Sequence, residues 1–222
     1  MKKFALIVAG GSGSRMNSIV PKQFMEIAGR PVLMHTFEAF YNYDSKLEFV
    51  LVLPENHLTP WKELCDKYRF DLKHKIAFGG KTRFHSVKNG LELVSDEGIV
   101  FIHDGVRPLV SQQTLQNCFE TANTKGNALP VVPVSESVRM VEKSENRAVD
   151  RSKYFLVQTP QTFQTGLIKE AYIKATSDLF TDDANVLESM GTNIHLVDGN
   201  RENIKITFPE DLLYAKMILS PL

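Results

Sequence analysis

The sequence has few cysteines, no net charge and no long apolar run, and each shortage narrows what the protein can be. Cys65 and Cys118 are too few and too far apart for a disulfide framework or a zinc site. This usage favours a reducing compartment. Lysine plus arginine balance aspartate plus glutamate at 26 each, so no overall field attracts nucleic acid or a membrane surface. An anionic ligand must therefore be bound by a local group of cations.

The apolar runs are too short for a membrane span, which needs about 20 consecutive apolar residues. The first residues, MKKFALIVAGG, imitate a secretion signal, because two lysines precede an apolar run. That run, residues 4–9, is shorter than the apolar core of a signal peptide. We therefore expect a buried first strand there. The protein is expected to be soluble and cytoplasmic, and to bind neither nucleic acid nor membrane.

Short apolar runs alternate with helix patterns along the whole chain. Continuous apolar runs are typical of strands that are covered on both faces of a mostly parallel sheet. They lie at 4–9, 48–54, 75–78, 98–103, 127–134, 154–158, 193–197 and 203–207. With 222 residues, of which 43% are hydrophobic, the chain suits one domain over 1–222. The pattern predicts a Rossmann-like, doubly wound α/β fold with helices on both faces of the sheet.

Helices are expected between these runs, because prolines and small polar residues stand where first turns would begin. The expected starts are Pro31, Thr59-Pro60, Ser111 and Pro209. The acidic pair Asp182-Asp183 is interpreted as the capped start of a helix that ends at Gly191, rather than as an acid–base pair. One segment, 135–155, is polar and has no helical stripe. We predict a β-hairpin arm there, with a turn around 143–146; a solvated loop is the alternative.

Glycines follow the first apolar run directly, in the stretch LIVAGGSGSRMNSIVPKQF. In open α/β sheets, ligands lie beyond the carboxyl ends of the strands, and glycine lets backbone N–H groups approach a phosphate. The stretch is no P-loop, because it lacks the Gly-Lys-Ser/Thr ending. It lacks the third glycine of the dinucleotide fingerprint, which excludes an NAD-binding dehydrogenase domain. With Arg15 at the end of the loop and Lys22 in PKQF, it fits a triphosphate clamp.

These residues also carry a family resemblance. AGGSGSRM followed by PKQF resembles nucleotidyltransferases that join a sugar or polyol phosphate to a nucleoside monophosphate. Further motifs follow in order: GGKTRFHSV at 79–87, HDGVRP at 103–108, VDR at 149–151, QTPQTF at 158–163, TDDA at 181–184 and NIKIT at 203–207. The ordered set covers nearly the whole chain. It is similar to that of the 2-C-methyl-D-erythritol 4-phosphate cytidylyltransferases of the non-mevalonate isoprenoid pathway.

The resemblance implies a transfer in which a substrate phosphate oxygen attacks the α-phosphorus of CTP and pyrophosphate leaves, with Mg²⁺ as the divalent cation. The implied catalytic residues are Arg15, Lys22 and Lys205. The implied nucleotide-binding residues are Ala9, Gly10, Gly11, Ser12, Gly13, Gly79, Gly80, Ser86, Asp104 and Gly105, with Asp104 also binding the metal. The implied contacts of the polyol phosphate are Arg107, Ser137, Arg151, Thr159 and Lys205. In this family the arm crosses to a second subunit and completes its site, so a homodimer is expected.

Local structural roles are the alternatives at several of these positions. Thr82 and Ser86 can be backbone partners at a helix start. Asp104 can be a turn or capping residue, and Arg107 can form an internal ion pair. His103 is expected to be structural, because a phosphate nucleophile needs no base.

Two departures from the family pattern leave a second activity open. Glu136-Ser137 stands where the family commonly has Asp-Thr, and VAGG stands where PAAG is common. Ribitol-5-phosphate cytidylyltransferases also have VAGG, so transfer to ribitol 5-phosphate is the alternative, although VDR favours methylerythritol phosphate. An inactive, nucleotidyltransferase-like regulatory module is disfavoured, because binding alone does not require Arg15, Lys22 and Lys205 together. Lys205 places a charge in an expected strand, which favours a functional lysine.

Overall fold

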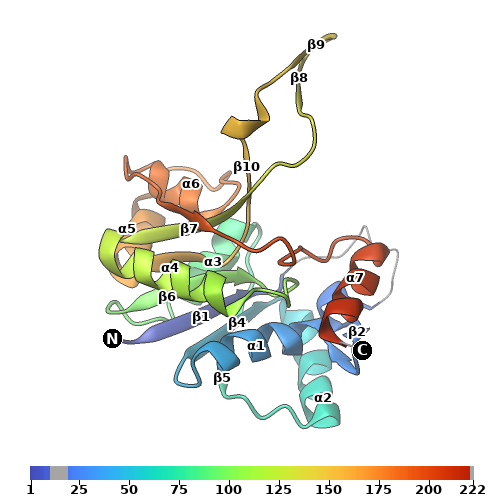
Figure 1. The fold of residues 1–222 in the computed structure, drawn as a ribbon. Helices are drawn as coiled ribbons and strands as arrows, with labels where there is room; N and C mark the ends of the chain where they lie inside the picture. Colours follow the sequence, from blue (N-terminus) through green and yellow to red (C-terminus); the bar gives the residue numbers. More distant parts are fainter. Residues whose placement is uncertain (11–19, 221–222) are drawn as a thin grey trace.

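The computed structural model describes residues 1–10 and 20–220, and it is built on an eight-stranded sheet (Figure 1). The strand order is β10-β7-β11-β6-β1-β4-β5, and β12 also pairs with β7. The strands are β1 Lys3–Val8, β4 Glu48–Leu53, β5 His74–Phe78, β6 Ile99–Asp104, β7 Asn127–Pro133, β10 Phe155–Val157, β11 Gln161–Gln164 and β12 Leu196–Asp198. Strands β1, β4, β5 and β6 are parallel, while β11 is antiparallel to β6 and β10 to β7. The predicted mostly parallel sheet is confirmed.

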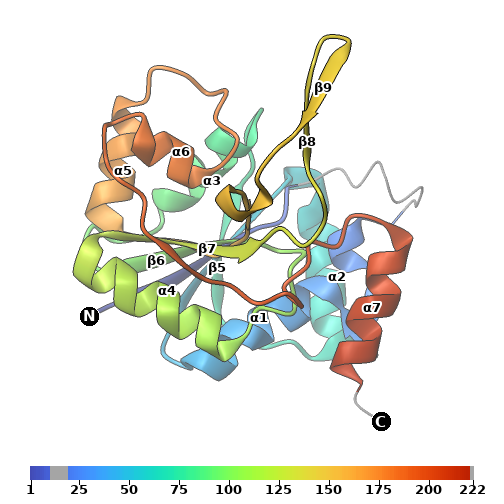
Figure 2. The same ribbon diagram turned by 45° about the horizontal axis from the view of Figure 1, so that its top comes forward.

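Helices cover both faces of this sheet, as the two views in Figures 1 and 2 show. One face carries α1 Val32–Tyr43, α2 Leu58–Tyr68 and α4 Gln112–Lys125, and the other carries α3 Arg83–Leu91, α5 Thr165–Lys174 and α6 Asp183–Glu188. Side chains of β1 alternate between the two layers: Ala5 and Ile7 pack in the first, and Phe4 and Leu6 in the second. Both faces of β1 are therefore apolar, which explains its continuous hydrophobic run.

Smaller elements lie beside the sheet. The last helix, α7 Pro209–Leu219, and the hairpin of β2 Glu26–Ile27 and β3 Arg30–Pro31 share a separate core that includes Ile27, Ile206 and Ala215. Single 3-10 turns are η2 Lys22–Phe24, η3 Glu55–His57 and η4 Arg151–Lys153. Among residues 1–10 and 20–220, no helix has the length and apolar character needed to cross a membrane.

Most of the expected helix starts are present. The Ser111 hydroxyl accepts the Thr114 N–H at 3.0 Å at the start of α4, and Asp182 accepts the Asn185 N–H at 2.8 Å at the start of α6. The start expected at Thr59-Pro60 is wrong. Helix α2 begins at Leu58, directly out of η3, so that Thr59 lies inside its first turn rather than at its cap.

The strand expected over 203–207 is also wrong. This segment has no strand conformation, and it meets the loop after β6 through one backbone bond, from the Ile206 N–H to the Val106 carbonyl at 2.9 Å. The pattern NIKIT suggested a strand because apolar and polar residues alternate in it. Ile206 does point into a core, but the segment lies across the end of the sheet. Lys205 is therefore carried by an irregular segment.

The predicted hairpin arm is confirmed. Strands β8 Arg139–Glu142 and β9 Glu145–Ala148 pair antiparallel and project from the body of the molecule (Figures 1 and 2). The turn is at 143–144, where Lys143 has a positive φ of 54°. Nearly all side chains of both strands are exposed, so the body of the same subunit does not support the arm.

Candidate active site

The loops that follow β1, β5 and β6 meet at one edge of the sheet. Because these strands are parallel, their carboxyl ends lie at the same edge. Backbone bonds continue the pairing into the loops: the Ala9 N–H donates to the Val52 carbonyl at 2.8 Å, and the Gly105 N–H to the Val8 carbonyl at 2.9 Å. The predicted nucleotide-binding residues Ala9, Gly10, Gly79, Gly80, Asp104 and Gly105 thus gather here. The predicted residues Gly11, Ser12, Gly13 and Arg15 lie outside the described residues.

Ser86 joins two of these loops. Its Oγ accepts the Gly80 N–H at 3.0 Å and donates to the Thr82 carbonyl at 3.0 Å. A Cβ added at Gly79 would lie 3.3 Å from this oxygen, and one added at Gly10 would lie 3.9 Å from it. The hydroxyl therefore sits between the glycine after β1 and the glycines after β5. The alternative in which Ser86 and Thr82 are backbone partners at a helix start is confirmed.

Two of the glycines are fixed by close packing. A Cβ at Gly80 would lie 2.3 Å from the Cβ of His85, a distance that no side chain tolerates. A Cβ at Gly105 would lie 3.0 Å from Leu33 Cδ1 and 3.2 Å from Ala9 Cβ. Gly80 therefore has no room for a side chain, whereas a side chain at Gly105 would require Leu33 and Ala9 to shift by a few tenths of an ångström.

Asp104, the last residue of β6, is the centre of a charge cluster. Its Oδ2 accepts the Arg107 Nε–H at 3.2 Å and lies 3.2 Å from Lys205 Nζ. Burial alone would raise the pKa of Asp104, but Lys205 and Arg107, with Arg83 further away, hold it well below its usual range. The carboxylate is therefore ionised at neutral pH. The internal ion pair that was the alternative role of Arg107 is confirmed.

Lys22 is bonded to the irregular segment 203–207, which carries Lys205. Lys22 is buried, and its Nζ donates to the carbonyl of Ile206 at 3.0 Å. The Arg107 Nη1 donates to the carbonyl of Asn203 at 2.7 Å, which ties the same segment to the turn after Asp104. Lys22 and Arg107 are thus both bonded to the segment that carries Lys205.

Gln23 anchors the turn that carries Lys22. Its side-chain Nε2 donates to the Ala9 carbonyl at 3.0 Å and lies 3.3 Å from Nδ1 of His57. The side chain is almost fully buried. Gln23 therefore fixes η2 against the end of β1, a contact that the sequence did not predict although PKQF was singled out.

Behind the charge cluster lies a buried hydrogen-bonded group. His103 Nε2 lies 2.9 Å from the Arg107 carbonyl, and its Nδ1 lies 3.0 Å from Thr159 Oγ1. The Asp104 N–H donates to the same hydroxyl oxygen at 3.1 Å. Burial lowers the pKa of His103 to about 4, so that the ring is neutral at neutral pH. The expected structural character of His103 agrees with this position.

Arg83 and Asp183 form an ion pair that the sequence did not predict. Both Arg83 terminal nitrogens donate to the Asp183 carboxylate at 2.7 Å, and the Tyr172 hydroxyl donates to it at 2.6 Å. The Asp183 side chain is wholly buried. The two residues stand in the motifs GGKTRFHSV and TDDA, but nothing in the sequence indicates that these motifs touch. The pair locks the start of α3 to the start of α6.

A cavity of about 220 Å³ opens beside this cluster. Its lining includes Arg83, Asp104, Arg107, Thr159, Asp182 and Lys205. Two residues predicted to contact the polyol phosphate, Ser137 and Arg151, are not part of the lining. Both are exposed at the base of the arm, where the Arg151 Nη1 donates to the Ser135 carbonyl.

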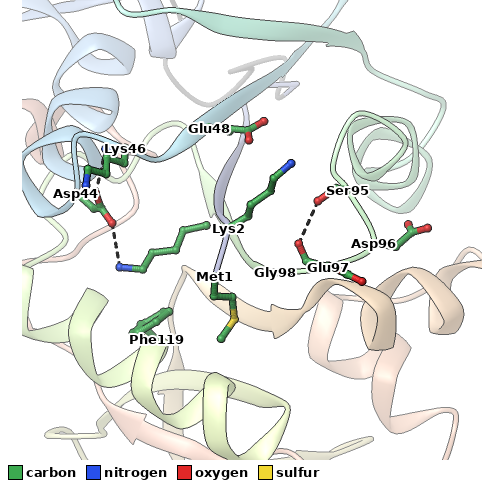
Figure 3. Close-up of a pocket in the computed structure, with 11 residues that line it drawn as sticks. Met1, Lys2, Asp44, Lys46, Glu48, Ser95, Asp96, Glu97, Gly98 and Phe119 are labelled. Atoms are coloured by element: carbon green, nitrogen blue, oxygen red, sulfur yellow. Dashed lines mark hydrogen bonds and ion pairs between the residues drawn. The ribbon is translucent and has the colours of Figure 1, made fainter.

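A larger cavity, of about 910 Å³, lies at the amino ends of β1 and β6 (Figure 3). Lysines and carboxylates both line it: Lys3 pairs with Asp44 at 2.9 Å, and Lys2, Glu48 and Glu97 stand around the opening. None of the motifs singled out in the sequence reaches this end of the strands. The site is therefore expected at the opposite edge.

Comparison with known proteins identifies similar chains over the full length. The family model described as IspD, 2-C-methyl-D-erythritol 4-phosphate cytidylyltransferase, matches residues 4–221. Proteins of that name from Phocaeicola vulgatus and Bacteroides fragilis are 52% and 53% identical over 219 residues, which is 99% of this chain and 100% of each relative. The crystal structure of the protein of that name from Thermus thermophilus superposes with a TM-score of 0.81 and 33% identity, covering 98% of both chains.

Proposed function

This chain belongs to the 2-C-methyl-D-erythritol 4-phosphate cytidylyltransferase family, and we propose that the charge cluster at the carboxyl edge of the sheet carries out the reaction of that family. The enzyme is a CTP-dependent nucleotidyltransferase, which joins CTP and 2-C-methyl-D-erythritol 4-phosphate to give 4-diphosphocytidyl-2-C-methyl-D-erythritol and pyrophosphate. The observation that carries the proposal is that the segment 203–207 is bonded to Lys22 through the Ile206 carbonyl and to Asp104 through Lys205.

The reaction asks for positioning and charge more than for covalent chemistry. An oxygen of the acceptor phosphate attacks the α-phosphorus of CTP, and the bond to the β-phosphate oxygen breaks as pyrophosphate leaves. Negative charge is spread over the phosphoryl oxygens in the transition state, where fixed cations stabilise it. We assign this role to Arg15 and Lys22, with the loop from Ala9 to Gly13 around the triphosphate and Lys205 beside the attacking phosphate.

We assign cytosine recognition to the loop after β5. Selecting cytosine requires hydrogen bonds to its amino group and to O2, and backbone groups can supply both. The Ser86 hydroxyl already bonds to the Gly80 N–H and the Thr82 carbonyl. In this proposal Ser86 therefore shapes the loop, while backbone groups of Gly79 and Gly80 face the base. Asp104 and Gly105 bound the nucleotide on the side of β6.

The geometry of Asp104 fits a divalent cation. Its Oδ2 is engaged by Arg107 and Lys205, but within the described ranges, 1–10 and 20–220, no donor is bonded to Oδ1. Mg²⁺ commonly takes one or two carboxylate oxygens, with phosphates and waters as its other ligands. When bound, Mg²⁺ would neutralise charge on the triphosphate. Among the described residues no group of three or more His, Cys, Asp or Glu side chains could hold a metal ion.

We further propose a homodimer in which the arm of one subunit reaches the site of the other. Arg151 and Ser137 stand on the arm and outside the lining of the 220 Å³ cavity of their own subunit. Phe155, Leu156 and Val157 at the base of the arm are 43 to 56% exposed. Such an apolar strip is typical of an interface with another chain. The two free thiols favour the cytoplasm as the compartment.

A pyrophosphate-release assay tests the function directly. It crosses CTP, UTP and ATP with methylerythritol 4-phosphate and ribitol 5-phosphate, with Mg²⁺ or with excess chelator. We expect turnover with CTP and methylerythritol 4-phosphate that stops in chelator and returns with Mg²⁺. Equal turnover with UTP would contradict the assignment of the loop after β5. Preference for ribitol 5-phosphate would contradict the assignment of methylerythritol 4-phosphate as the acceptor. Full activity in chelator would contradict the role of Asp104 as a metal ligand.

A further inference from the structure

Thr159 has one hydroxyl hydrogen, and the atoms around it decide where that hydrogen goes. The first constraint comes from His103, whose Nε2 lies 2.9 Å from the Arg107 carbonyl. A carbonyl oxygen only accepts, so Nε2 carries a hydrogen. His103 is completely buried, and its ring packs edge-on against Phe40 with the ring centroids 4.9 Å apart. In the part of the chain that the structure describes, no carboxylate is bonded to the ring, so the neutral form is favoured.

A neutral ring with a hydrogen on Nε2 has an acceptor at Nδ1. Thr159 Oγ1 lies 3.0 Å from this Nδ1, so the hydroxyl must donate to it. The same oxygen accepts the backbone N–H of Asp104 at 3.1 Å. The hydrogen bonds therefore run in one direction, from the Asp104 N–H to Thr159, from Thr159 to His103, and from His103 to the Arg107 carbonyl. This chain begins and ends on the turn 104–107.

The turn 104–107 carries two charged side chains that contact Lys205 or the segment around it. Asp104 reaches Lys205 with its carboxylate, and Arg107 reaches both that carboxylate and the Asn203 carbonyl. A small shift of the turn would move both charges against the segment 203–207. Misplacement of reacting groups by about 1 Å can lower a rate by about 100-fold. The internal hydrogen bonds of the turn thus bear on the geometry of the site.

We propose that His103 and Thr159 are positioning residues, which hold the turn 104–107 and its charges in register with Lys205. The proposal rests on the assignment of the charge cluster to cytidylyl transfer. It changes the role expected for Thr159 from the family resemblance, which was contact with the polyol phosphate. A phosphate needs a donor, and the only hydroxyl hydrogen of Thr159 is committed to His103.

A double-mutant cycle distinguishes a positioning role of Thr159 from direct contact with the polyol phosphate. Thr159→Val removes the hydroxyl with little change of shape, and His103→Phe removes both ring nitrogens. We expect each variant to lower kcat by about tenfold to 100-fold while KM for the acceptor changes less than about threefold. We expect the double variant to be no worse than the poorer single one, because both act on the same turn. Thr159→Ser, which keeps the hydroxyl, should restore most of the kcat lost in Thr159→Val.

A matched control is available in the chain. The Thr165 hydroxyl is buried and has no hydrogen-bond partner within the described residues, so Thr165→Val removes a buried hydroxyl without breaking a bond. Its kcat should equal that of the unaltered protein. If Thr159→Val instead raises KM for the acceptor tenfold or more at unchanged kcat, Thr159 binds the substrate directly and the proposal is wrong. Multiplied effects of the two single changes would also overturn it.

Nitrogen-15 NMR of histidine-labelled protein gives a readout that does not depend on activity. We expect His103 to be neutral, with its hydrogen on Nε2, and we expect the Nδ1 resonance to shift in Thr159→Val. A hydrogen on Nδ1, or a doubly protonated ring, would free the hydroxyl hydrogen of Thr159 for a substrate and would overturn the proposal. If the pyrophosphate assay failed while this tautomer was found, the fault would lie with the assigned function and not with the hydrogen-bond chain.

Discussion

At the scale of single residues, the site depends on buried charge. Lys22 is 8% exposed, and burial of a lysine is unfavourable unless donors and acceptors are matched. The carbonyl of Ile206 provides such a match, and Gln23 beside it is bonded to the end of β1. The ammonium group is therefore held in one place before any substrate arrives. A cation fixed in this way stabilises developing charge without reorganisation during the reaction.

The proposed triphosphate clamp predicts the effect of removing either of its two cations, Arg15 and Lys22. Arg15→Ala and Lys22→Ala should each lower kcat by about 100-fold to 1,000-fold, by analogy with the loss of one oxyanion donor. Steady-state kinetics should show kcat and kcat/KM falling together, because the interaction is made mainly in the transition state. Lys62→Met on the exposed face of α2 is a matched control and should be unchanged. A variant with normal kcat and only a raised KM for CTP would show ground-state binding instead.

Sequence patterns located many of these residues but not their contacts. Asp104 and Lys205 stood in recognisable motifs, but their contact could not be predicted, because Lys205 lies on an irregular segment and not on a strand of the sheet. The ion pair of Arg83 and Asp183 could not be predicted, because the two residues are 100 positions apart and each has other local uses. Gln23 was inconspicuous for the same reason, since a buried amide contact leaves no periodic signal.

At the scale of elements, α7 anchors the segment that carries Lys205. The Asp211 carboxylate accepts the Thr207 N–H at 2.7 Å and the Phe208 N–H at 2.8 Å, so that the start of the helix is joined to the end of segment 203–207. An acidic residue in the first helical turn also interacts favourably with the helix dipole. The Asp211 cap is therefore connected through the backbone to the segment that carries Lys205.

Removing this cap should affect both stability and catalysis. Asp211→Ala is expected to lower the free energy of unfolding by about 1 kcal/mol, as for other helix caps, and also to lower kcat. Ser111→Ala removes a cap of similar strength from α4 and should lower stability by a similar amount at unchanged kcat. Denaturant unfolding and steady-state kinetics of the two variants make the comparison. If kcat were equal in the two variants, the cap of α7 would not contribute to the placement of Lys205.

The ion pair between α3 and α6 predicts a larger loss of stability. Asp183→Asn leaves Arg83 without its buried counter-charge and should lower the free energy of unfolding by about 3–5 kcal/mol. Replacing both partners, as Arg83→Met with Asp183→Leu, should cost less than the single change, because no buried charge is left unpaired. Urea unfolding of the single and double variants measures the difference. Simple addition of the two losses would mean that the residues do not act as a pair.

Elements were predictable where one periodicity dominated. The hairpin arm was predicted correctly because Val138 and Met140 alternate with polar neighbours and no helical stripe competes. Strand β11 was missed because its residues, QTFQ, are mostly polar although three of the four are buried between β6 and β7. The segment 203–207 was mistaken for a strand because alternation describes side-chain direction and says nothing about a pairing partner.

At the scale of the whole molecule, the proposal is that one subunit alone has an incomplete site. The fold class was predictable because continuous apolar runs indicate strands covered on both faces. The strand order was not, because it depends on long-range pairing. Figures 1 and 2 show the arm directed away from its own body, and Arg151 lies at its base. In the proposed homodimer, two copies are needed to bring Arg151 to a phosphate, where an arginine can bind two oxygens at once.

Subunit mixing tests this central claim most directly. Arg151→Ala, deficient in acceptor binding, is mixed with Lys22→Ala, deficient in chemistry, under conditions in which exchange of subunits is demonstrated by a tagged copy. Random pairing makes about half of the dimers mixed, and each mixed dimer then has one site with both defects and one with neither. We predict recovery to about a quarter of the activity of the unaltered protein. A mixture that stays as inactive as its two parents after exchange, or a protein that sediments as a monomer under assay conditions, would contradict the shared site.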